Sequence, residues 1–484
     1  MYTRKVNHTV IPAAIALFVL AMQPVVAQEP DRAAPPKIGA VRPLNLPALQ
    51  SLTLGNGIPV SVMEKHGAPL VELHLMFRCG IADDPDSKPG LASLTAAMMM
   101  EGAGTRSALD LADAIDFLGA RISVDASHHT TTVSLFTPVS RLDDALALLA
   151  DIALHPSFPS AELERVRAER LTAMKQWKDQ PRTIASVYCN RRVYGDAHPY
   201  GRPGIGNPKA LASMRVEDIR AFHAKYMNAA HLNIIVAGDV ASTALLSRLE
   251  TYFGKLSKGP GSASILPSVQ QVKQRRIVIV DKPGAAQSEI RIVRVGPVRA
   301  TPDYFALMVM NTLLGGSFSS RLNQNLREKN GYTYGARSSF AFRKGPGPFI
   351  AGAGVQTAVT DKALAEFMNE LRAIREQASE EEILRAKNYV AYGYPQNFET
   401  VGGIADEMEE LVEHGLPANY FSTFVPSILA VTADDVRRVA TQYVDPEAIE
   451  IIIVGDRKEI EYGVRALKLG DVKVISVEDA LGYE

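Results

Sequence analysis

The strongest constraint on the fold is an internal repeat, in which segments of the first half recur in the second half at a nearly constant spacing. Four short segments recur in the same order: Gly119–Arg121 as Gly335–Arg337, Asp144–Leu146 as Lys362–Leu364, Val216–Arg220 as Ala433–Arg437, and Val236–Asp239 as Ile453–Asp456. The offsets of the four pairs differ from one another by no more than two positions. One such match can arise by chance, but four in order with nearly equal offsets indicate a duplicated chain. The sequence therefore predicts two tandem domains of the same fold.

The two halves also share an order of predicted elements. Each begins with apolar strands, continues with helices that carry charge pairs, and ends with a nearly continuous apolar strand. The opening strands are expected at 60–62 and 71–77 and again at 277–280 and 290–295, and the closing strands at 232–237 and 449–454. This mixture predicts an α+β fold: two tandem homologous domains, each a mainly antiparallel sheet with helices packed on it, facing each other across a cleft.

Composition divides the chain into five predicted segments. Residues 1–27 have a cationic start, an apolar run and small residues before Gln28, which is the pattern of a cleavable signal peptide. We expect residues 28–47 to form a Pro/Ala-rich leader, 48–256 the first domain, 257–274 a linker and 275–484 the second domain. The apolar run is short for a membrane span, so a retained anchor is the less favoured alternative. The mature protein is expected in the periplasm.

The net charge bears on the partners of the chain, and the cysteine content bears on its disulfides. The formal net charge of −1 offers no broad basic surface, so nucleic acid is not an expected partner. No membrane contact is expected after cleavage of the signal peptide. Export makes a disulfide between Cys79 and Cys189 chemically possible, but two buried thiols are the favoured interpretation.

A helix with a family resemblance is predicted after Gly90. The segment from Gly90 to Gly102 resembles the metal-binding helix of the pitrilysin/insulinase metallopeptidases, in which a similar Gly-Leu-Ala run leads into His-x-x-Glu-His. The resemblance extends to His198–Pro203 in the first half and to Ser319–Leu322 and Arg327–Tyr334 in the second. With the repeat, it covers nearly all of the mature chain. The chain is most similar to bacterial two-domain members that resemble the subunits of mitochondrial processing peptidase.

The resemblance also identifies the metal ligands that this chain lacks. Positions i, i+3 and i+4 of a helix share one face, so the family motif places two imidazoles and a carboxylate around one zinc. Here these positions are Ser93, Ala96 and Ala97, and the family's third ligand, a glutamate on a later helix, corresponds to Ala173. Methyl groups and a hydroxyl do not replace the three protein ligands of a catalytic zinc. No metal and no cofactor are therefore expected in this chain.

Other candidate ligands do not form a zinc site in the sequence. His128 and His129 are adjacent and would point to opposite sides of a strand. Glu410 and His414 lie one turn apart on a predicted helix, where an isolated pair is more often a solvated face. A chain that has lost catalysis and serves only as a structural protein is a further alternative.

The second half keeps a different part of the family's active site. Arg327 and Tyr334 are seven residues apart and resemble the family's Arg and Tyr pair, which reaches the substrate at the zinc. By this resemblance Arg327 holds the substrate backbone. Tyr334, chosen over Tyr332 on spacing, donates a hydrogen bond to the oxyanion of the tetrahedral intermediate. A helix end broken by Gly331 is compatible with the same residues.

A chain that keeps this pair without zinc ligands is expected to work with a second chain. We expect a heterodimer in which a homologous zinc-bearing peptidase subunit supplies the zinc. An unfolded peptide, paired with an exposed sheet edge, would be the substrate. The chain is then inactive alone but part of a zinc metalloendopeptidase. The alternatives are a non-catalytic scaffold or peptide-binding subunit of a larger assembly, and a homodimer that binds peptides or signal sequences.

Overall fold

The computed structural model describes residues 39, 44–261, 265–376 and 378–482. The predicted signal peptide at 1–27 and most of the predicted leader at 28–47 lie outside these ranges. The described chain from residue 44 onward belongs to one compact unit, Pro43–Glu484. None of the helices in the described ranges has the length and hydrophobicity of a membrane span.

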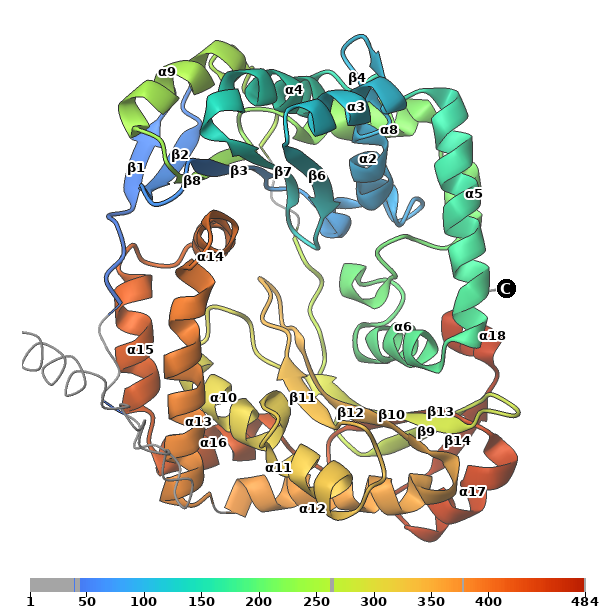
Figure 1. Ribbon diagram of the computed structural model, residues 1–484. Coiled ribbons are helices and arrows are strands. Elements are labelled where there is room, and N and C mark those ends of the chain that lie inside the picture. Colours follow the sequence, from blue (N-terminus) through green and yellow to red (C-terminus); the bar gives the residue numbers. More distant parts are fainter. Residues whose placement is uncertain (1–38, 40–43, 262–264, 377, 483–484) are drawn as a thin grey trace, which may run out of the picture. The chain divides into compact units, whose positions relative to one another are not determined.

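Two mixed sheets of six strands each form the framework (Figure 1). The first contains, in spatial order, β1 (Gln50–Thr53), β2 (Pro59–Glu64), β8 (Leu232–Gly238), β3 (Leu70–Phe77), β7 (Thr131–Pro138) and β6 (Arg121–Ala126). The second contains β14 (Val472–Ile475), β9 (Arg276–Asp281), β13 (Glu450–Gly455), β10 (Gln287–Val295), β12 (Pro348–Gln356) and β11 (Arg337–Phe340). A separate pair consists of β4 (Gly102–Ala103) and β5 (Arg106–Ser107).

The two sheets share one topology except at the strands β1 and β14. In both sheets the second and third strands are parallel, as in β2 with β8 and β9 with β13, and the next three pairings are antiparallel. The first residues of β3 and β10, Leu70 and Gln287, are separated by the same offset as Val236 and Ile453 of the sequence repeat. The strand β1 lies antiparallel to β2, whereas β14 lies parallel to β9. The predicted α+β fold with two homologous halves is confirmed.

Burial along the strands follows their place in the sheets. Every residue of β8 and of β13 is buried, as expected for strands with neighbours on both sides and cover on both faces. The strand β6 instead alternates exposed and partly exposed residues. It lies at the end of its sheet, so one row of its backbone N–H and C=O groups has no neighbouring strand.

Helices connect and cover the strands. The helices of the first half are α2 (Leu91–Met99), α3 (Ala108–Phe117), α4 (Leu142–Leu154), α5 (Ser160–Gln176), α6 (Pro181–Tyr194), α7 (Pro208–Ser213), α8 (Val216–Tyr226) and α9 (Ser242–Phe253). Those of the second half are α10 (Tyr304–Asn311), α11 (Arg321–Asn323), α12 (Thr360–Glu376), α13 (Glu380–Gly393), α14 (Val401–His414), α15 (Tyr420–Ala430), α16 (Ala433–Tyr443), α17 (Arg457–Ala466) and α18 (Val477–Leu481). Two π-helical turns, η5 (Thr312–Gly316) and η6 (Gln324–Lys329), flank α11.

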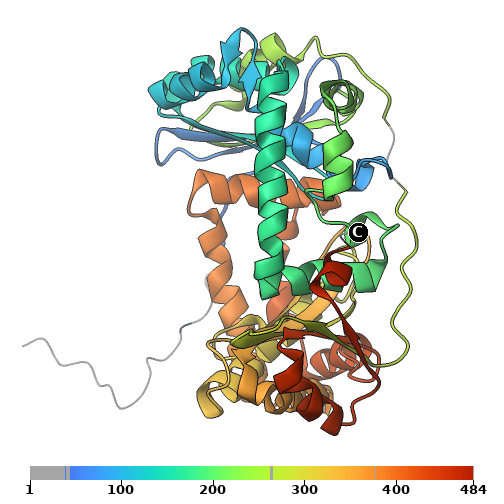
Figure 2. The same cartoon turned by 90° about the vertical axis from the view of Figure 1, so that its right-hand side faces the viewer.

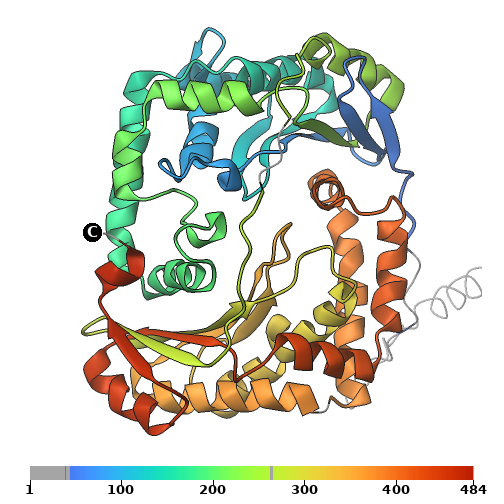
Figure 3. The ribbon, with the colours of Figure 1, turned by 180° about the vertical axis from the view of Figure 1, so that it is seen from behind.

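The equivalent helices α6 and α14 are exchanged between the halves. The helix α6 packs on β10 and β13 of the second sheet, and α14 packs on β3 and β8 of the first (Figures 1 and 3). The helix α5 spans the distance from the first half to α6 (Figure 2). Ile184 and Cys189 of α6 are buried in one apolar cluster with Ile452 of β13. Cys79 lies in the cluster of the first half, and both thiols are free and buried, as expected.

A buried ionic contact fastens α14 to the first sheet. His74 of β3 lies 2.7 Å through Nδ1 from Glu409 Oε2 and 3.3 Å through Nε2 from Glu72 Oε1. Thr132 of β7 donates to the other oxygen of Glu409 at 2.6 Å. Burial lowers the pKa of His74, but the hydrogen bonds to Glu409 and Glu72 outweigh it and raise the pKa to about 9. His74 is therefore charged at neutral pH and joins the two halves.

This contact predicts a loss of stability in alkali. The pKa of His74 is about 9 in the folded chain and about 6.5 when unfolded, so the contribution is complete below pH 6.5 and disappears as the pH rises through 9. We expect a loss of roughly 3 kcal/mol at most, measured as the fall in the unfolding free energy between pH 7 and pH 10. The variant His74→Gln should lack this part of the fall. An equal fall in wild type and variant would contradict the prediction.

Candidate functional site

The residues matched to the zinc motif lie on α2, whose start is fixed by its neighbours. Gly90 has a φ of 95°, a conformation that glycine adopts without strain. The carboxylate of Asp84 accepts hydrogen bonds from the N–H groups of Gly90 at 2.6 Å and Ala92 at 2.7 Å. Burial outweighs these bonds and raises the pKa of Asp84 to about 7. The helix begins at Leu91, and the first matched position, Ser93, lies in its first turn.

The three matched positions carry small side chains. Ala96 is buried, and Ser93 and Ala97 are partly exposed. The hydroxyl of Ser93 lies within hydrogen-bond distance of the carbonyl oxygens of Gly90 (3.1 Å) and Gly204 (2.7 Å). Ser93 therefore ties α2 to the loop that follows the His198–Pro203 segment.

The helix α5 brings an arginine to the same place. Arg170 lies one turn before Ala173, and its Nη1 and Nη2 donate to Ser93 Oγ at 3.0 Å and to Ser93 O at 2.7 Å. Burial lowers the pKa of Arg170 to about 10, against the attraction of Asp84. The guanidinium is still charged at neutral pH. The first of the positions matched to the zinc ligands, Ser93, is therefore in contact with a positive charge.

These residues do not fit a zinc ion. A catalytic zinc is held by imidazole, thiolate or carboxylate groups, whereas Ser93, Ala96, Ala97 and Ala173 offer one hydroxyl and three methyl groups. A metal cation here would also be repelled by Arg170. Across the described ranges, no group of three or more His, Cys, Asp or Glu side chains is arranged to hold a metal ion.

Arg327 and Tyr334 lie on either side of a helix end. Arg327 belongs to the π-helical turn η6, a form that is frequent at functional sites. Gly331 follows with a φ of 64°, and its N–H donates to the carbonyl of Arg327 at 3.0 Å. Thr333 Oγ1 donates to Gly354 O of β12 at 2.7 Å, which anchors the turn. Tyr334 is 92% exposed, so its hydroxyl projects from a fixed backbone.

The guanidinium of Arg327 lies over the ring of Phe318. Its Cζ is 4.6 Å from the ring centroid, a cation–π distance. Phe318 is 66% exposed, and its backbone is held by a hydrogen bond from Asn323 Nδ2 to its carbonyl at 2.7 Å. Arg327 makes one ion pair, with its neighbour Glu328 at 3.5 Å. Phe318 therefore orients an arginine that retains free donors.

The described chain does not join the two sets of predicted site residues. No recorded hydrogen bond, ion pair or ring contact within the described ranges links Arg327 or Tyr334 to α2 or α5. Each set lies on its own half.

Family models match the segments that contain both sets of residues. The model described as Insulinase (Peptidase family M16) matches residues 60–198, and the model described as Peptidase M16 inactive domain matches residues 213–390. The chain belongs to the M16 insulinase family.

Relatives within the M16 family differ in their stated activity. An uncharacterized zinc protease of Mycobacterium leprae is 26% identical, and the matched region covers 59% of this chain and 64% of that protein. The non-peptidase homolog YmxG of Helicobacter pylori is 22% identical over 83% of this chain and 93% of that protein. A probable mitochondrial-processing peptidase subunit beta of Arabidopsis thaliana is 24% identical over 86% of this chain and 80% of that protein. Membership of the M16 family alone therefore does not decide whether this chain cleaves peptides.

A solved structure shows the same arrangement. The peptidase M16 inactive domain from Pseudomonas fluorescens superposes with a TM-score of 0.79 and 25% identity, over 84% of this chain and 98% of that chain. The structural similarity therefore extends over most of this chain.

Two further M16-like motifs of this chain have structural roles. Tyr200, in the His198–Pro203 segment, is fully buried and accepts a hydrogen bond from Gly345 N at 3.0 Å. It thereby contacts the second half. Arg321 forms a two-pronged ion pair with Glu382 at 2.8 and 2.9 Å, which lowers the pKa of Glu382 to about 2. These contacts explain both motifs without a role in chemistry.

One expectation about the histidines was wrong. His128 and His129 lie in the turn between β6 and β7 and not on a strand with opposite orientations. Their ring centroids lie 4.9 and 5.5 Å from that of Tyr200. Burial lowers the pKa of each to about 3. Glu410 and His414 of α14 are both partly exposed, in agreement with a solvated pair, and Glu410 also pairs with buried Arg299 at 2.8 Å.

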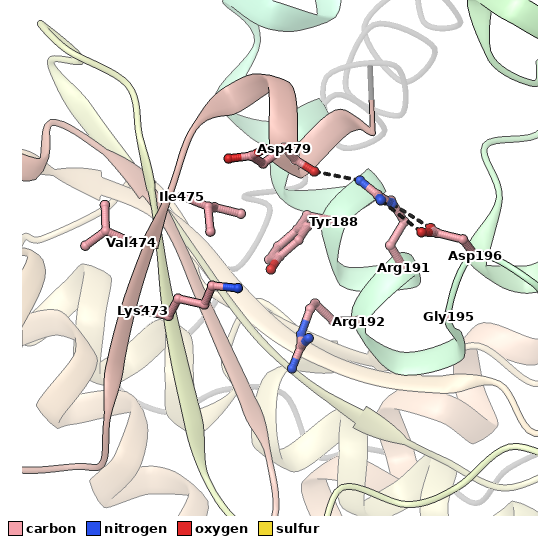
Figure 4. A pocket seen from close by; sticks show the side chains of 9 residues that line it. All are labelled: Tyr188, Arg191, Arg192, Gly195, Asp196, Lys473, Val474, Ile475 and Asp479. Carbon is pink, nitrogen blue, oxygen red and sulfur yellow. Dashed lines mark hydrogen bonds and ion pairs between the residues drawn. The ribbon is translucent and has the colours of Figure 1, made fainter. Parts of the chain in front are cut away.

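Two arginines that line a pocket between α6 and β14 are already paired (Figure 4). Arg191 binds the carboxylate of Asp196 at 2.7 and 3.0 Å and the carbonyl of Asp479 at 2.7 Å. Arg192 donates to buried Glu450 at 2.8 Å. Arg191 and Arg192 therefore differ from Arg170, which has no carboxylate at ion-pair distance in the described part of the chain.

Arg170 and Phe318 were not predicted from the sequence. Arg170 is three residues from Ala173, which places both on one face of α5, and this spacing was the available signal. Phe318 is separated from Arg327 by nine residues and by a break in the helix, so no periodic pattern connects them.

Proposed function

We propose that this chain is the non-zinc-binding subunit of a heterodimeric zinc metalloendopeptidase. A homologous partner would supply the zinc, which polarises the scissile carbonyl and activates water. This chain would supply Arg327 and Tyr334. The observation that carries the proposal is the contrast between the two sites. The positions matched to the metal ligands carry a serine and three alanines, and the serine, Ser93, is bonded to Arg170. Tyr334, in contrast, is 92% exposed on an anchored turn.

Each residue has a role that its surroundings support. The guanidinium of Arg327 retains donors for a peptide carbonyl and is oriented by Phe318. The phenol of Tyr334 can donate to the oxygen that becomes negative in the tetrahedral intermediate, where a fixed donor stabilises charge without reorganisation. An extended peptide can add to an edge strand such as β6, whose outer backbone row is unpaired. That mode favours unfolded substrates.

The place of action is part of the same proposal. The pattern of residues 1–27 is that of an export signal, so we propose that the heterodimer forms in the periplasm. Release of the mature chain into a periplasmic fraction, with an amino terminus near Gln28, is the measurement that checks it.

A non-catalytic scaffold or peptide-binding subunit is the second candidate function. It is favoured by the name of the Helicobacter pylori relative, a non-peptidase homolog. Under this alternative Arg327 and Tyr334 would have no chemical role. The two candidates differ in whether the exposed pair affects the rate of cleavage.

The test compares the chain alone with a mixture. The chain would be purified alone and with the product of a neighbouring gene that carries the full zinc motif. Bound zinc and cleavage of an unstructured fluorogenic peptide would then be measured. We expect no zinc and no cleavage with the chain alone, and activity in the mixture above that of the partner alone. Zinc-dependent cleavage by the isolated chain would refute the proposal. An active mixture that is indifferent to Arg327→Ala and Tyr334→Phe would favour the scaffold.

Loss of the contact between Phe318 and Arg327 should lower the rate of peptide cleavage less than loss of Arg327 or of the Tyr334 hydroxyl. Phe318→Ala removes a partly solvated cation–π contact worth about 0.5–1 kcal/mol, so kcat/KM of the mixture should fall about two- to fivefold. Phe318→Trp should retain activity. The matched control is Phe117→Ala, because Phe117 is also exposed and lies 5.7 Å below an arginine, Arg141, on the other half. Equal effects of the two alanine variants would contradict the positioning role.

A further inference from the structure

The charge of Arg170 is not balanced at close range. Its two recorded hydrogen bonds go to a hydroxyl and a carbonyl, both of Ser93. Asp84 attracts the guanidinium from beyond ion-pair distance, but within the described ranges no carboxylate lies at ion-pair distance from it. Arg165 and Arg167 of the same helix, in contrast, pair with glutamates. A partly buried guanidinium without a carboxylate is unusual, because burial of an unpaired charge is costly.

The surroundings of Arg170 leave donors and partly exposed surface for a ligand. A guanidinium has five N–H donors in a planar fork, and the bonds to Ser93 use only part of them. Arg170 itself is partly exposed, and so are Ala97 and Ala173 beside it. Methyl groups at these positions neither compete for the donors nor fill the space that imidazole and carboxylate side chains would take.

We propose that Arg170 and Ser93 form a binding site for a peptide carboxylate, at the place where a metal ion would be held in a zinc-bearing relative. A carboxylate matches the planar donor fork of arginine, and the bond is charge-assisted. Ser93 of this site lies on α2, which packs against the edge strand β6, and Arg170 reaches it from α5. A peptide that extends β6 would therefore pass beside Arg170.

The proposal deepens the proposed function, because it rests on the same class of ligand, an extended peptide. It does not depend on catalysis or on a partner. Binding is measured on this chain alone, so the carboxylate site can fail while cleavage by a complex succeeds, and the reverse is equally possible.

The experiment compares three forms of one unstructured peptide of about ten residues. The first has a free carboxyl terminus, the second is amidated, and the third is amidated but has one glutamate within the sequence. Binding of each fluorescent peptide to the full chain would be measured by anisotropy at low salt. We expect the amidated peptide to bind about tenfold more weakly than a carboxylate form, the effect of one charged hydrogen bond. The arm that retains affinity identifies a terminal or a side-chain carboxylate.

Variants connect the preference to Arg170. Arg170→Gln should remove the difference between acid and amide peptides, and Arg170→Lys should keep part of it because the charge is retained. Arg165→Gln is the matched control, since it removes a paired cation from the same helix. Wild-type binding that does not distinguish the peptides, or a preference that survives in Arg170→Gln, overturns the proposal. The wild-type comparison decides even if Arg170→Gln fails to fold.

Discussion

Replacement of Tyr334 by phenylalanine is expected to lower kcat for peptide cleavage by the mixed subunits about a hundred- to thousandfold. The phenol hydroxyl is the only group removed. Its proposed hydrogen bond forms to the oxyanion and not to the ground-state carbonyl, so KM should change little. Arg327→Ala, in contrast, would remove the proposed contact to the substrate backbone and should raise KM as well.

Exposure makes this result easy to interpret. Tyr334 is 92% exposed and its hydroxyl makes no recorded hydrogen bond within the described chain, so the unfolding temperature should not change. Tyr462→Phe is the matched control, because Tyr462 is 87% exposed on α17, and it should leave kcat unaffected. Full activity of Tyr334→Phe in an active mixture would contradict the catalytic role and leave the scaffold alternative.

The repeated fold was predictable because its signal is local and occurs twice. The closing strands β8 and β13 are continuous apolar runs, and their burial on both faces confirms that interpretation. The offset between Val236 and Ile453 in the sequence repeat reappears between Leu70 and Gln287, the first residues of equivalent strands. The order of strands and helices in each half could therefore be predicted from hydrophobic periodicity.

The exchange of α6 and α14 was not predictable in the same way. Each helix has an apolar face, and that face indicates burial but not the sheet that covers it. The deciding contacts are long-range. His74 meets Glu409, 335 residues later, and Ile184 meets strands of the other half. Single-sequence patterns carry no information about such pairs.

The site shows the same division between local and long-range information. The loss of metal ligands at Ser93, Ala96 and Ala97 follows from one helix and its spacing. The preference for Tyr334 over Tyr332 also rests on spacing, and the greater exposure of Tyr334 agrees with it. The contact of Arg170 with Ser93, by contrast, joins two helices 77 residues apart in sequence. Absence of ligands was readable, but the arginine in their place was not.

Restoring the zinc ligands is therefore expected to fail while Arg170 is present. We consider a variant with Ser93→His, Ala96→Glu, Ala97→His and Ala173→Glu. A unit charge and a divalent ion about 6 Å apart repel by roughly 5 kcal/mol at an effective dielectric constant of about 20. The new glutamate at position 173 would also lie one turn from Arg170 and pair with it. Adding Arg170→Ala should tighten zinc binding at least about a hundredfold, measured by competition with a chromophoric chelator.

The control for this comparison is Arg165→Ala in the same fourfold variant. Arg165 has the same charge on the same helix, but three glutamates pair with it, so its removal should change zinc affinity little. Equal zinc affinity with and without Arg170 would show that the guanidinium moves away when ligands are supplied, and that loss of ligands alone explains the missing metal site. A gain in zinc affinity on removal of Arg170 but not of Arg165 would mean that the charge of Arg170 prevents zinc binding. Recovery of the four ligands alone would then not restore a zinc site in this chain.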